Sequence, residues 1–78
     1  RLAKTIVNLL EDFAVPHGDG YLLKMKLTHQ DFADLIASTR ETVTVTLNKM
    51  KNDDLIEAEG RFLVIPDLER LRRVGEIA

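Results

Sequence analysis

Side chains between residues 40 and 48 offer the hydrogen-bond donors, acceptors and methyl groups that can read the edges of DNA base pairs. An arginine can donate two hydrogen bonds to guanine, a glutamate can accept one from cytosine, and an asparagine can pair with adenine. The methyl groups of threonine and valine can meet the methyl group of thymine. We therefore expect base-reading roles for Arg40, Glu41, Thr44, Val45 and Asn48.

A second set of side chains suits contact with phosphate groups. The first backbone N–H groups of a helix have no partner inside the helix, and together with nearby hydroxyl and amide side chains they bind phosphate oxygens. Residues of this kind stand at the starts of two expected helices: Thr28, Gln30, Thr39 and Thr42. In a hairpin expected further along, Arg61 is the cation available for a phosphate, whereas Glu59 should repel one.

The first of the two helices that position these residues begins at Thr28. Asp31 follows three residues later, as in a capping box. Its buried face is expected to consist of Phe32, Leu35 and Ile36. The small residues Ala37 and Ser38 mark a tight break after it.

The second helix is predicted from Arg40 to about Asn52, with Ser38 or Thr39 as its cap. Its inner stripe recurs at helical spacing and consists of Val43, Leu47 and Met50. At 100° per residue, the side chains of residues 41, 44, 45 and 48 lie about 100° to 200° away from Val43. They therefore point away from the core, and Arg40 can reach past the helix end.

The remaining elements complete a small domain. An apolar stripe predicts an opening helix: Leu2, Ile6, Leu9, Leu10 and Phe13. Pro16 and residues 18–20 read as a loop, and residues 21–27 as a brief strand. Gly60 permits a hairpin whose second strand is 62–65, and Pro66-Asp67 starts a last helix whose apolar side is Leu68, Leu71, Val74 and Ile77. The expected fold is mainly α with a small antiparallel β wing: a winged helix-turn-helix, which presents its second helix to the major groove.

Composition limits the chemistry open to this chain. The 78 residues form one domain, and the absence of cysteine excludes disulfides and thiolate zinc sites and favours a cytoplasmic location. No apolar run approaches the roughly 18 residues of a membrane span, so no membrane partner is expected. Net charge is −2, and residues 28–65 hold four Lys/Arg against seven Asp/Glu, so a single copy should bind DNA weakly.

Catalytic and metal-binding chemistry find little support. The histidines, His17 and His29, are not paired at ligand spacing, and Ser38 has no histidine partner in its sequence context. We therefore expect neither an enzyme nor a cofactor in this domain.

The stretch STRETVTVTLNKMKNDDLIEAEGRFLVI resembles the DNA-binding domain of the Crp/Fnr family of bacterial transcription regulators. The similarity runs without gaps from about Leu27 to Ile65 and extends back to RLAKTIVNLL. It implies that Arg40 and Glu41 read bases, and that the threonines and Gln30 named above contact phosphates. It also implies that this chain is a fragment of a longer homodimer with a sensor domain and a dimerisation helix, neither present here. Such a dimer would bind a palindromic operator of roughly 22 base pairs, with RNA polymerase as a candidate partner.

Some features depart from that pattern or admit another interpretation. Many relatives carry arginine where this chain has Val45, and a larger apolar residue where it has Thr46. Glu41 could instead complete a capping box with Ser38, and Arg40 could be a solvated cation at the helix end. The acidic balance also leaves open a winged-helix module that binds protein without DNA specificity.

Overall fold

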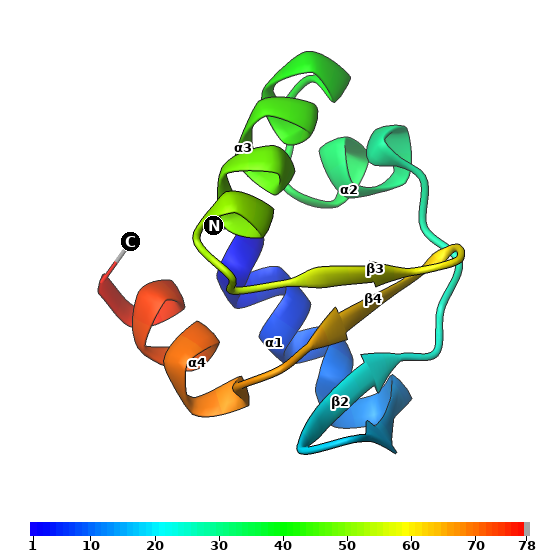
Figure 1. The fold of residues 1–78 in the computed structure, drawn as a ribbon. Helices are drawn as coiled ribbons and strands as arrows, with labels where there is room; N and C mark the ends of the chain where they lie inside the picture. Colours follow the sequence, from blue (N-terminus) through cyan, green and yellow to red (C-terminus); the bar gives the residue numbers. More distant parts are fainter. Residues whose placement is uncertain (78) are drawn as a thin grey trace.

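The computed structural model describes residues 1–77 as four helices and a four-stranded sheet (Figure 1). In chain order the elements are α1 (Leu2–Phe13), β1 (Ala14–His17), β2 (Gly20–Leu23), α2 (His29–Leu35), α3 (Arg40–Asn52), β3 (Glu57–Glu59), β4 (Phe62–Ile65) and α4 (Leu68–Ile77). Helices α2 and α3 lie together at one end of the molecule, and the β1–β2 hairpin lies at the other. The expected winged helix-turn-helix is confirmed.

The sheet is larger than the sequence suggested. Its order is β1-β2-β4-β3, and every neighbouring pair is antiparallel. Residues 14–17, expected to enter a loop, instead pair with β2. Pro16 is tolerated there because β1 is an edge strand, where a missing N–H costs no ladder bond. Charged Glu57 and Glu59 occupy β3 at the other edge. The proline at one edge and the charges at the other both hinder pairing of the sheet with a strand of a second chain.

Strand β2 ends at Leu23 and does not continue to residue 27 as expected. The Met25 N–H donates to the Leu23 carbonyl at 2.8 Å, which is a three-residue turn centred on Lys24. That turn redirects the chain toward α2 while Met25 and Leu27 still pack partly buried against the core. The apolar residues therefore continue to alternate as far as Leu27, although the strand itself ends at Leu23.

One hydrophobic core joins the helices to the sheet. Its fully buried side chains include Ile6, Leu23, Phe32, Val43, Leu47, Ile56, Ile65 and Leu71. Helix α1 packs against α4, and α2 packs against α3. The first of these contacts is close: a Cβ on Gly75 would lie 3.2 Å from the Lys4 backbone. Among the described residues no polar or charged side chain is buried.

The expected starts of α2 and α4 are both present. Thr28 caps α2 in a complete capping box: its hydroxyl accepts from the Asp31 N–H at 3.0 Å, and its N–H donates to the Asp31 carboxylate at 2.9 Å. Asp67 accepts from the Arg70 N–H at 3.2 Å at the start of α4. The side chain of Ile77, expected on the apolar side of α4, lies outside the part of the chain that is described.

The expected buried face of α2 is wrong at one residue, Leu35. Its side chain is 55% exposed, whereas Phe32 and Ala33 are buried and Ile36 is partly buried. On a helical wheel the middle of the Phe32–Ala33 face lies close to Ile36 and about 110° from Leu35. Leu35 is therefore carried out of the core by the same geometry that brings Ile36 toward it.

Both helices of the helix-turn-helix end in the same way. After α2, Ala37 has φ +53°, and the Ser38 N–H donates to the Ala33 carbonyl at 2.8 Å. After α3, Asp54 has φ +60°, and the Leu55 N–H donates to the Met50 carbonyl at 2.9 Å. These are Schellman motifs in which residues other than glycine adopt the left-handed conformation. They set the break between α2 and α3 and the turn from α3 into the wing.

Candidate nucleic-acid interface

Helix α3 has one buried face and one open face. Val43, Leu47 and Met50 lie in the core. The opposite face holds exposed Glu41, Val45 and Asn48, and the Val45 side chain is 69% exposed. Arg40 is exposed at the start of the helix. Four of the five residues expected to read bases are thus exposed to solvent. Thr44 lies beside them but is half-buried.

Thr39, not Ser38, caps α3. Its hydroxyl accepts from the Thr42 N–H at 3.2 Å and donates to the Thr42 hydroxyl at 3.0 Å. Because Thr42 occupies the third helical position, a capping box between Ser38 and Glu41 is ruled out. Glu41 is exposed in the first turn, where the helix dipole favours a carboxylate.

Thr44 is held by a contact between the two helices. Its hydroxyl lies 2.7 Å from Nδ1 of His29 and 3.0 Å from the Arg40 carbonyl oxygen, to which it donates. His29, partly buried at the start of α2, was not expected to take part in the interface. The two residues are 15 positions apart, and no periodicity of the sequence pairs them.

The candidate phosphate contacts lie at the starts of α2 and α3, and all four are exposed: Thr28, Gln30, Thr39 and Thr42. Their hydrogen bonds differ. Gln30 donates from Nε2 to Asp34 Oδ1 at 2.9 Å, and the Thr39 hydroxyl donates to the Thr42 hydroxyl. Among residues 1–77, the hydroxyls of Thr28 and Thr42 accept hydrogen bonds and donate none. These two hydroxyls therefore keep a proton that a phosphate oxygen could accept.

The wing presents Arg61 at the tip of the β3–β4 hairpin. Gly60 and Arg61 form its two-residue turn, and the φ of +60° at Gly60 alone fits a type II′ turn. Arg61 and Glu59 are both exposed, so a cation and an anion stand side by side at this tip. Lys24 adds a second cation nearby, with its Nζ 5.1 Å from the centre of the Phe62 ring.

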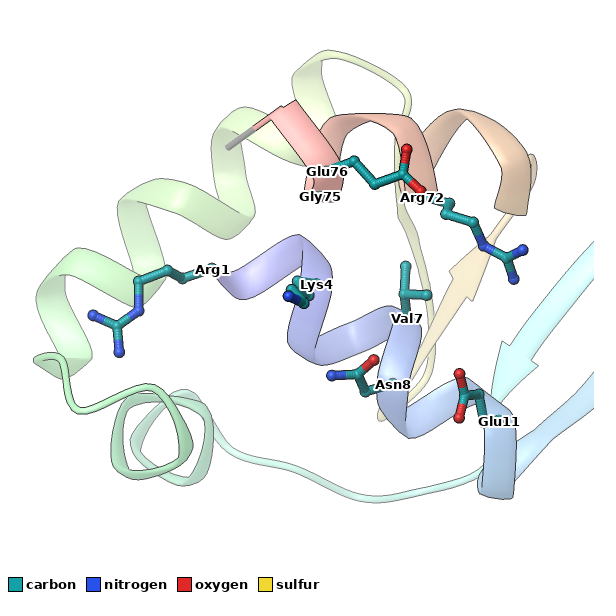
Figure 2. Close-up of a pocket in the computed structure, with 8 residues that line it drawn as sticks. All are labelled: Arg1, Lys4, Val7, Asn8, Glu11, Arg72, Gly75 and Glu76. Atoms are coloured by element: carbon teal, nitrogen blue, oxygen red, sulfur yellow. The ribbon is translucent and has the colours of Figure 1, made fainter.

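A large hollow of the described surface lies elsewhere, between α1 and α4 (Figure 2). Its volume is ≈ 710 Å³, and its lining carries both signs of charge: Arg1, Lys4, Val7, Asn8, Glu11, Arg72, Gly75 and Glu76. None of the expected site residues lines it. Within residues 1–77, no group of three or more His, Asp or Glu side chains could hold a metal ion.

A family model described as "Crp-like helix-turn-helix domain" matches residues 1–74. The chain belongs to this family. It is a winged helix-turn-helix domain of the kind with which Crp/Fnr-type transcription regulators bind DNA. The resemblance that the sequence showed over residues 27–65 and back to the first helix is thereby confirmed, and it is extended to most of the last helix.

Curated relatives of this Crp-like domain are longer proteins. The chain is 41% identical over 65 residues to the global nitrogen regulator of Synechococcus elongatus, covering 83% of this chain and 29% of the relative. It is 33% identical over 73 residues to a CRP-like cAMP-activated global transcriptional regulator of Mycobacterium tuberculosis, covering 94% of this chain and 33% of that one. The chain thus spans about a third of the length of such relatives.

A solved structure has the same fold as this Crp-like domain. It is that of the CO-dependent transcription factor CooA from Carboxydothermus hydrogenoformans, with a TM-score of 0.84 and 31% identity. The match covers 94% of this chain and 34% of that chain. None of the helices within residues 1–77 has the length and hydrophobicity that crossing a membrane requires.

Proposed function

We propose that this chain binds double-stranded DNA sequence-specifically by placing α3 in the major groove. The observation that carries the proposal is the open face of α3. Glu41, Val45 and Asn48 are exposed there and Arg40 is exposed at the helix start, while the opposite face of the same helix is buried in the core. A helix supported in this way can enter the groove without rearrangement of the domain.

The proposed contacts divide into two classes. Arg40 and Glu41, in the first turn of α3, read a G·C pair, and Asn48 reads a base about two turns further along the helix. Val45 contacts a thymine methyl group, and Thr44 joins it on the side toward α2. The phosphate groups are contacted by Arg61 of the wing and by the polar residues at the helix starts: Thr28, Gln30, Thr39 and Thr42.

We further propose that the chain acts as one half of a pair. Seven acidic against four basic residues in positions 28–65 leave few cations for phosphates, so one copy binds weakly. A longer protein with a sensor domain and a dimerisation helix would supply a second copy and present both α3 helices to a palindromic operator. RNA polymerase is a further proposed partner, and this domain itself needs no cofactor.

A selection of random duplexes with the intact protein tests this function. The expected result is an enriched palindrome with a G·C pair at one fixed offset in each half. Arg40→Ala should weaken binding by about 1–3 kcal/mol per half-site and relax the preference at that pair alone. Arg61 is the one cation assigned to a phosphate, so it predicts a salt slope of about −1 per copy, at −0.9 for each neutralised phosphate.

The second candidate function is a winged-helix module that binds protein, and the acidic balance favours it. That function predicts no enriched sequence and little dependence of binding on salt. Arg40→Ala would then leave DNA binding unchanged, so the same selection and salt titration distinguish the two functions.

A further inference from the structure

His29 and Thr44 form the one side-chain hydrogen bond between α2 and α3 among the described residues. His29 Nδ1 lies 2.7 Å from the Thr44 hydroxyl oxygen, and that hydroxyl lies 3.0 Å from the Arg40 carbonyl oxygen. Both side chains are partly buried. The pair stands beside exposed Arg40 and Val45, on the edge of the face proposed to meet the bases.

The Thr44 hydroxyl has one proton, which it donates to a hydrogen bond within the protein. If His29 carries hydrogen on Nδ1, the ring donates to the hydroxyl and the hydroxyl donates to the Arg40 carbonyl, so both contacts are hydrogen bonds. If Nδ1 carries none, it can itself accept the hydroxyl proton. In either tautomer Thr44 has no proton to give to a base acceptor such as guanine O6 or thymine O4.

We propose that His29 is a positioning residue that turns Thr44 into a reader of the thymine methyl group. With its proton committed, the side chain offers a base its methyl group, and thymine is the one DNA base with a methyl group in the major groove. This inference rests on the proposed function and deepens it. It assigns thymine to a position beside the G·C pair that Arg40 and Glu41 read.

The test replaces the thymines of the selected operator with deoxyuridine, one symmetric pair of positions at a time. Deoxyuridine keeps every hydrogen-bonding group and lacks only the methyl group. The intact protein should bind about fourfold more weakly per half-site when the methyl group facing Thr44 is removed, the value of one buried methyl group. Thr44→Ser keeps the hydroxyl and its bonds, so it should bind thymine and deoxyuridine equally at that position. Val45→Ala is the matched control and should remove discrimination only at a different thymine.

The role of His29 is measured by the ratio of the affinities for the thymine and the deoxyuridine duplex. His29→Asn can place an amide N–H near the position of Nδ1, and it should preserve discrimination between thymine and deoxyuridine. His29→Leu removes the donor and should bring the ratio toward one at the Thr44 position alone. A merely structural role for His29 would instead weaken binding to both duplexes equally, and circular dichroism of each variant verifies folding.

The outcomes separate the inference from the function beneath it. If the selection enriches no sequence, the proposed function fails. If a sequence is enriched but no thymine shows a ratio that depends on Thr44, or if His29→Leu leaves that ratio intact, the role of His29 is overturned while DNA recognition by α3 stands.

Discussion

Ala37 makes the turn between α2 and α3 in a conformation that costs an alanine free energy. Its φ is +53°, and the side chain is exposed. The left-handed conformation costs a residue with a Cβ about 1–2 kcal/mol. Glycine avoids that cost but loses about 0.4–1 kcal/mol through the greater freedom of the unfolded chain. Ala37→Gly should therefore raise the free energy of unfolding by about 0.5–1 kcal/mol.

Two matched variants isolate the cause. Asp54 has φ +60° in the equivalent position after α3, but a short polar side chain tolerates this conformation better than a methyl group does. Asp54→Gly should therefore raise the free energy of unfolding by less than Ala37→Gly does. Ala37→Val places a β-branched residue at positive φ, where such residues are outliers, and should lower the free energy of unfolding by more than about 1 kcal/mol.

Urea unfolding followed by circular dichroism measures these differences. In a domain of this size, a gain of 0.5–1 kcal/mol corresponds to a rise of about 2–8 °C in Tm. An Ala37→Gly variant less stable than the parent chain, or an Ala37→Val variant of unchanged stability, would refute the assignment of strain to this residue.

Three further experiments have defined outcomes. Glu59→Lys exchanges the anion beside Arg61 for a cation, so it should strengthen DNA binding regardless of sequence and steepen the salt slope by about 1. An effect confined to one operator in binding titrations would contradict this. Thr28→Ala removes the capping hydroxyl and should cost about 1 kcal/mol in urea unfolding, most of which Thr28→Ser should restore. Phe32→Ala should cost about 3–5 kcal/mol and Leu35→Ala well under half of that, because only Phe32 is buried; equal losses in urea would show that Leu35 is packed after all.

Local signals were enough to predict the helix-turn-helix. The capping box at Thr28, the stripe through Val43 and the break at Ala37 each depend on residues within one or two turns of one another. Spacing of this kind determines helix starts, inner faces and stops directly. The open face of α3 followed from the same spacing, which is why four of its five expected residues proved to be exposed.

Other features depend on pairing between distant segments. Pro16 indicated a loop, yet β1 exists because β2 supplies a partner and because nothing needs to pair with its outer edge. The strand that ends at Leu23 depends on a backbone turn that apolar alternation does not reveal. The contact between His29 and Thr44 needs two helices at a particular crossing, and no local pattern gives that crossing.

The electrostatics of the interface bear on how such a domain could be controlled. Because phosphate contacts must come from a few cations and some uncharged hydroxyls, each copy gains little affinity that is independent of sequence. Joining two copies can raise affinity by about 10²–10⁴ without any new contact, but only when both reach their half-sites together. On the proposed function, a small change in the spacing of two domains would therefore return binding to the weak level of one copy. An acidic domain is in this respect better suited to control by an attached sensor than a strongly basic one, whose single copies would stay bound in either arrangement.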